Sequence, residues 1–102
     1  MARLVGVDKR SDGTLTLRPA GELDLVTVPA LNDALRAALA EKPDRIVIDL
    51  ADVSFADVTG LRPVLSAQRT MARRGGRLEI RHASPQVSRV IHLCESLPGT
   101  LA

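Results

Sequence analysis

One hydroxyl group in this sequence, that of Thr59, lies where neighbouring groups could control its chemistry. It follows the carboxylate of Asp57 by two residues and directly precedes Gly60, close to the start of a predicted helix. A helix N-terminus presents free backbone amides and a partial positive charge, which attract a phosphate group. Asp57 would repel the same phosphate, so phosphorylation of Thr59 would disturb local packing and any docked partner. The alternative is that Thr59 merely caps the helix, and spacing alone favours this alternative.

The elements that position Thr59 follow from the spacing of apolar residues. Residues 46–48 (Ile-Val-Ile) are a β-branched run, typical of an internal strand that is covered on both faces. A short loop over residues 51–57 separates this strand from a helix that begins near Thr59 and has its apolar stripe on Leu61, Val64 and Leu65. Ligands and partners of α/β sheets usually meet the loops at the carboxyl ends of strands. The sequence therefore predicts a functional site at the junction over residues 49–61.

The rest of the chain reads as alternating strands and helices. Residues 21–24 are expected to form a polar connector, and Thr27 to cap the helix that follows. Strands are expected at residues 4–7, 15–17, 46–48 and 78–80, and the last helix is expected to start at Ser84-Pro85 and to close at residues 97–99. The order ββ-α-β-α-β-α predicts an α/β fold, with a small, mixed, mostly parallel sheet of four to five strands flanked by helices.

Composition restricts the class of function. The 102 residues, 45% hydrophobic and 25% charged, are enough for a single domain over residues 1–102 with one compact core. The one cysteine excludes an internal disulfide and a cysteine-cluster zinc site, and the two histidines are too few to indicate a metal centre. No nucleophile–base pair or phosphate-binding loop is found. We therefore expect no catalysis, no metal and no cofactor.

Charge and hydropathy bear on the partners and the compartment. The net charge of +2 implies no strong polyanion partner, and the basic residues between Arg62 and Arg81 are read as a solvated surface rather than a nucleic-acid patch. No apolar run reaches the ~18 residues that a membrane span needs. The first six residues also lack the core of a signal peptide, so the expected compartment is the cytoplasm, without membrane contact.

Five segments in order resemble a STAS domain, in particular the single-domain anti-sigma factor antagonists of bacteria. They are GELD at residues 21–24, IVIDL at 46–50, VSFADVTGL at 53–61, GGRL at 75–78 and SPQV at 84–87. The resemblance covers nearly the whole chain and implies a small sheet flanked by helices. It also implies a switch, in which the antagonist binds an anti-sigma factor and so frees a sigma factor for transcription. In the family the anti-sigma factor is a kinase that ends the interaction by phosphorylating the antagonist, and a phosphatase resets the switch.

The sequence departs from the family pattern at the phosphoacceptor. The family usually has Asp-Ser-Ser-Gly or Asp-Ser-Thr-Gly, with the first hydroxyl as acceptor, whereas this chain has Asp57-Val58-Thr59-Gly60. Val58 has no hydroxyl, and Thr59 matches the second position. Either Thr59 has become the phosphoacceptor, or the protein binds its partner constitutively; the second interpretation is preferred for the chemistry.

The resemblance also supplies candidate contacts with the partner. Matched to the family's motifs, they are Asp24, Asp57, Val58, Thr59, Gly60 and Leu61. Asp57 and Asp24 each have a structural alternative, as a helix cap and as a solvated loop acid. Gly60 is read as a helix start at which a side chain would crowd an approaching partner. A rival function uses the same fold, as a small-ligand sensor or a lipid-transport accessory module, or as an interaction module without phosphorylation. The sequence leaves the oligomeric state open.

Overall fold

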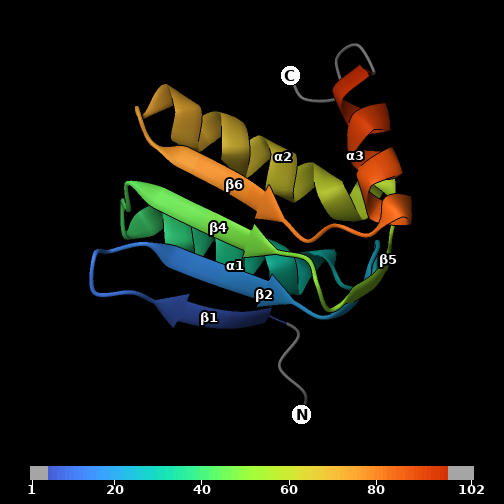
Figure 1. The fold of residues 1–102 in the computed structure, drawn as a ribbon, viewed down its shortest axis with the longest axis horizontal. Helices are drawn as coiled ribbons and strands as arrows, with labels where there is room; N and C mark the ends of the chain where they lie inside the picture. Colours follow the sequence, from blue (N-terminus) through green and yellow to red (C-terminus); the bar gives the residue numbers. More distant parts are fainter. Residues whose placement is uncertain (1–4, 97–102) are drawn as a thin grey trace.

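A four-stranded sheet forms the centre of the computed structural model, which describes residues 5–96 (Figure 1). Its strands follow the order β1-β2-β4-β6. Strand β1 is antiparallel to β2, whereas β2, β4 and β6 are mutually parallel. The strands are β1 (Val5–Lys9), β2 (Leu15–Pro19), β4 (Arg45–Asp49) and β6 (Arg77–Arg81). The expected mixed, mostly parallel sheet is therefore confirmed.

A second sheet contains only two strands, β3 (Gly21–Leu23) and β5 (Val53–Ala56), paired in parallel. Both segments were expected to be loops or connectors, and that prediction was wrong. Strands of three and four residues are too short to show the period-2 alternation by which a strand is recognised in a sequence. Their pairing also joins residues about thirty positions apart, which no local pattern reports.

Three helices complete the fold. Helices α1 (Val28–Ala40) and α2 (Val58–Arg73) contact each other and lie behind the sheet in Figure 1, while α3 (Pro85–Ser96) lies at one end beside β5. The expected start of α3 is confirmed, because the Val87 amide donates to Ser84 Oγ at 3.2 Å. Within the described residues, no helix is both long and apolar enough to cross a membrane.

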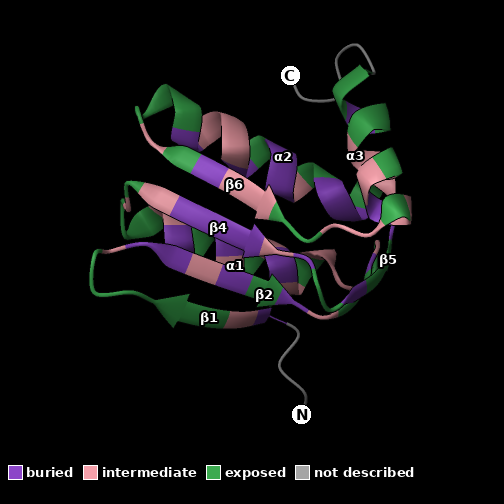
Figure 2. Cartoon of the chain, in the orientation of Figure 1, coloured by how far each residue is buried: buried purple, intermediate pink, exposed green. Residues whose placement is uncertain are grey.

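The core lies between the sheet and the two helices behind it (Figure 2). Leu17, Ile46 and Ile48 of the sheet belong to the same buried cluster as Leu61 and Val64 of α2, and all five are fully buried. Burial of a side chain of this size stabilises the fold by about 1.5–3 kcal/mol. Helix α2 therefore starts at a fixed position relative to the carboxyl end of β4.

Some predicted boundaries differ from the observed ones. Pro63 was expected in the first turn of α2, but the helix begins at Val58, so Pro63 is its sixth residue and cannot donate to the Thr59 carbonyl. Gly75, with a φ of +79°, follows the end of this helix. The prediction for residues 97–99 lies outside the described residues, as does Leu4 of the first predicted strand.

Candidate functional site

Asp57 organises the start of α2. Its Oδ1 accepts a hydrogen bond of 2.8 Å from the Gly60 amide, which makes Asp57 the N-cap of the helix. The expected structural role of Asp57 is thus confirmed, and the interpretation of Thr59 as the cap was wrong. Thr59 is instead the second helical residue and is exposed. Its hydroxyl is not used to begin the helix.

The loop from β3 to α1 is held by its own polar side chains. Asp24 Oδ1 accepts from the amides of Val26 and Thr27 at 3.0 and 3.2 Å. Thr27 Oγ1 donates to the Glu22 carbonyl at 2.7 Å and accepts from the Asp24 amide at 3.0 Å. Thr27 precedes α1 as expected, but its side chain does not cap that helix. Asp24 is therefore a turn-forming residue rather than a solvated acid.

This turn exposes two apolar residues that the sequence analysis missed. Leu25 is 74% exposed and Val26 is 85% exposed, because the bonds made by Asp24 and Thr27 direct the backbone inward and these two side chains outward. An available signal was the pair of adjacent large apolar residues that directly follows the polar connector at residues 21–24. A pair of apolar side chains exposed on an otherwise well-bonded turn is a feature of interaction surfaces.

Pairing of β3 with β5 brings this loop against the start of α2. The Asp57 amide donates to the Leu23 carbonyl at 3.1 Å. Gly60 packs so closely on the same segment that a Cβ would overlap the Leu23 carbonyl and come within 2.8 Å of the Asp24 amide nitrogen. Glycine is therefore required here because of the chain's own backbone, which corrects the expectation that a side chain would crowd a partner.

The other predicted contacts divide by exposure. Leu61 is fully buried in the core, so it cannot touch a partner directly, and its place among the expected contacts is corrected. Val58 is half-buried at the first helical position. Phe55, 41% exposed, lies opposite Glu22 in the β3–β5 pairing. We use the name docking surface for the end of the molecule formed by Leu25, Val26, Phe55, Val58 and Thr59.

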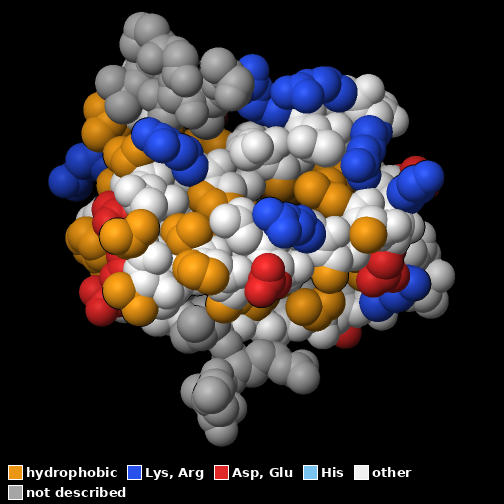
Figure 3. Space-filling view, turned by 180° about the vertical axis from the view of Figure 1, so that it is seen from behind, with side chains coloured by type: hydrophobic (Ala, Val, Ile, Leu, Met, Phe, Trp, Pro, Cys, Tyr) orange, Lys and Arg blue, Asp and Glu red, His pale blue; other side chains and the backbone are white. Residues whose placement is uncertain are grey.

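Acidic groups surround the docking surface. Glu22 and Asp52 are exposed at this end, and Asp24 and Asp57 are half-buried beside it. In the view from behind, hydrophobic side chains gather with Asp and Glu at one end of the molecule (Figure 3). Arg62 is an exposed cation one turn further along α2. The arrangement suits a partner that presents an apolar patch flanked by positive charge.

Asp49, at the end of β4, has a structural role. Its Oδ1 accepts from the Ala51 amide at 3.0 Å and lies 3.0 Å from His82 Nδ1. The Ala51 amide and the bond with His82 hold the pKa of this carboxyl below its ordinary value. Among residues 5–96, no cluster of three histidine, cysteine or acidic side chains could hold a metal ion.

Comparison with known proteins gives one family. Residues 7–95 match the family model described as "Mlab, STAS domain". The anti-sigma-B factor antagonist of Bacillus subtilis is 30% identical over 90 residues, which are 87% of this chain and 82% of that protein. The crystal structure of an anti-sigma factor antagonist from Mycobacterium paratuberculosis has a TM-score of 0.78 at 29% identity and covers 92% of this chain and 81% of that one. Unphosphorylated SpoIIAA, at 24% identity, a TM-score of 0.76 and coverage of 89% and 80%, shares the fold. The chain belongs to the STAS domain family, and its relatives by sequence are anti-sigma factor antagonists.

Proposed function

We propose that this protein is an anti-sigma factor antagonist, which binds an anti-sigma factor of the switch-kinase type through the docking surface and so frees a sigma factor for transcription. The observation that carries the proposal is the exposure of Leu25 and Val26 on a turn that packs against Gly60 at the start of α2 and whose polar groups are already paired within the chain. Such a turn gains by burying its apolar tip against a partner. The function is binding rather than catalysis.

The test is binding of purified switch kinases from the source organism by isothermal titration calorimetry. Replacement of both tip residues, Leu25→Ser with Val26→Ser, is expected to weaken binding at least 30-fold, about 2 kcal/mol. The matched control is Val7→Ser, which changes a valine that is 53% exposed on β1, away from the docking surface. Equal affinities for the double variant and the control would contradict the proposal.

We further propose that phosphorylation at the family's usual acceptor position does not regulate this binding, so the protein binds its partner constitutively. Val58 stands at the position where the family has its acceptor serine, and it has no hydroxyl. Incubation with the bound kinase and ATP is then expected to leave the mass of the wild type unchanged. Val58→Ser is expected to gain one phosphate under the same conditions. A phosphate on the wild type that Thr59→Ala abolishes would show that Thr59 is the acceptor and that a switch with a phosphatase operates.

A second candidate is binding of a small ligand or a lipid-transport component on the same fold. One observation favours it, a hollow of about 670 Å³ on α3, lined by Gln86, Arg89, Val90, His92, Leu93 and Ser96. A ligand that binds only the folded state raises the melting temperature by mass action. If nucleotides or phospholipids raise the melting temperature and no switch kinase binds, the second function is supported and the first is contradicted.

A further inference from the structure

The side chain of Gln86 makes two hydrogen bonds to a single residue of β5. Gln86 Oε1 accepts from the Ala56 amide at 3.1 Å, and Gln86 Nε2 donates to the Ala56 carbonyl at 2.8 Å. A carboxamide has the same donor and acceptor as a peptide unit, so it takes the place of a neighbouring strand at the outer edge of β5, where residues 5–96 supply none. We call this pair of bonds the Gln86 clamp.

The clamp acts on the residue that ends β5 and directly precedes the cap of α2. Ala56 is fully buried in the intact protein, and its amide and carbonyl both pair with the Gln86 side chain, so loss of that side chain removes the partners of both groups. On the other edge of β5, Ala56 is aligned with Leu23, whose carbonyl accepts from the Asp57 amide. The β5–α2 junction is therefore held by β3 on one side and by α3, through Gln86, on the other.

We propose that Gln86 is a positioning residue for the docking surface, because it fixes the β5–α2 junction and with it the orientation of Val58 and Thr59. The expected effect on partner binding rests on the proposed function. The two hydrogen bonds of the Gln86 clamp do not depend on that function. The buried residues Val87 and Cys94 attach α3 to the rest of the molecule independently of the clamp. Loss of the Gln86 side chain is therefore expected to loosen the junction while α3 stays in place.

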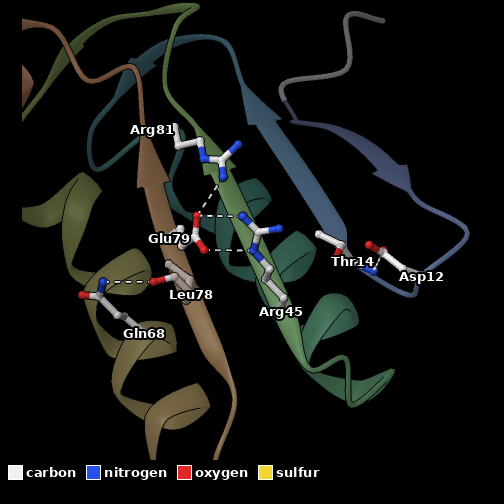
Figure 4. Close-up of polar contacts among 7 residues, drawn as sticks. All are labelled: Asp12, Thr14, Arg45, Gln68, Leu78, Glu79 and Arg81. Atoms are coloured by element: carbon white, nitrogen blue, oxygen red, sulfur yellow. Dashed lines mark hydrogen bonds and ion pairs between the residues drawn. The ribbon is translucent and has the colours of Figure 1, made fainter.

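Amide hydrogen exchange tests the clamp without any partner. In Gln86→Ala, exchange at Ala56 is expected to become at least 10-fold faster, with a smaller increase at Asp57, whose amide donates to the Leu23 carbonyl. The matched control is Gln68→Ala, which removes another half-buried glutamine, one that donates to the Leu78 carbonyl at 3.2 Å (Figure 4). The control is expected to leave Ala56 unchanged. Unchanged exchange at Ala56 in Gln86→Ala would overturn the proposal.

A conservative variant separates the clamp from a mere space-filling role. In Gln86→Glu, the neutral carboxylic acid has one donor and one acceptor and can form both bonds, whereas the carboxylate has no donor and repels the Ala56 carbonyl. After correction for intrinsic exchange rates, protection of Ala56 is expected to be near wild type at low pH and to fall as the introduced carboxyl ionises. Protection that does not change with pH would contradict a hydrogen-bonding role.

Binding of the switch kinase identified under the proposed function then tests the positioning. Gln86→Ala is expected to weaken this binding about 10-fold and Gln68→Ala less than 2-fold, with equal far-UV circular dichroism. If exchange at Ala56 rises and affinity does not change, Gln86 is not a positioning residue for the partner. If no kinase binds the wild type, the proposed function fails, and the exchange data still decide whether the clamp exists.

Discussion

On the open face of the four-stranded sheet, charged side chains pair with one another, whereas the docking surface directs apolar side chains to solvent. Glu79 accepts two bonds of 2.9 Å from Arg45 and a third of 2.9 Å from Arg81 (Figure 4). Val47 is aligned with Glu79 on the neighbouring strand and is 5% exposed, although no helix within residues 5–96 covers this face. At the docking surface, by contrast, Leu25 and Val26 have no such cover.

Under the proposed function, the contrast separates the residues that stabilise the fold from those that bind the partner. The sheet face satisfies its charges internally and has little to gain from a partner, since exposed paired charges would have to be desolvated again. At the docking surface, the turn pairs its backbone with the side chains of Asp24 and Thr27, and it leaves the apolar area of Leu25 and Val26 to be buried by another protein. Substitutions on the sheet face should therefore change stability, and those at the tip of the docking surface should change binding.

The largest expected effect is at Gly60, because a substitution there should change both the stability of the fold and the binding of the partner. Gly60→Ala forces a Cβ into the Leu23 carbonyl, so we expect a loss of about 3 kcal/mol in the free energy of unfolding and loss of partner binding. Urea denaturation followed by circular dichroism measures the first effect. The control is Gly6→Ala, where a Cβ would lie 3.8 Å from its nearest neighbour and should change stability by less than about 0.5 kcal/mol. Equal stabilities for the two variants would contradict the close approach of the β3–α1 loop to α2.

A smaller effect is expected at Asp57. Asp57→Ala removes the bond to the Gly60 amide and should cost about 1 kcal/mol of unfolding free energy, whereas Asp57→Asn keeps an acceptor and should cost much less. The same denaturation experiment measures both. A binding loss in Asp57→Asn without a stability loss would sharpen the comparison, because it would show that the negative charge, rather than the cap, contacts the partner.

The four-stranded sheet and the three helices could be predicted from the sequence because their patterns are local. The apolar run at residues 46–48 predicts a buried strand, and the apolar stripe from Leu61 to Leu65 predicts a buried helix face. The β3–β5 pair could not be predicted, since its two short strands become strands only by pairing with each other. The reason for Gly60 follows from that pairing and was misread with it. The exposure of Leu25 depends on side-chain bonds within the β3–α1 turn, which a hydropathy pattern does not report. Asp57 as a cap was predictable, because a cap needs only the few residues that follow it.

The smallest expected effect is at Glu79, on the sheet face. Hydrogen bonds from Arg45 and Arg81 lower the pKa of this carboxyl from 4.5 to about 2. Because the folded-state pKa lies below the unfolded one, the stabilising contribution is fully present above about pH 4.5 and is lost as the pH falls toward about 2. Glu79→Gln should therefore lower the urea midpoint at about pH 7 and lower it less at about pH 3, and solvent exposure keeps the difference small. Affinity for the partner should not change. If Glu79→Gln weakens binding as much as the double substitution of Leu25 and Val26 does, then the sheet face is part of the interface and the separation between the two regions is wrong.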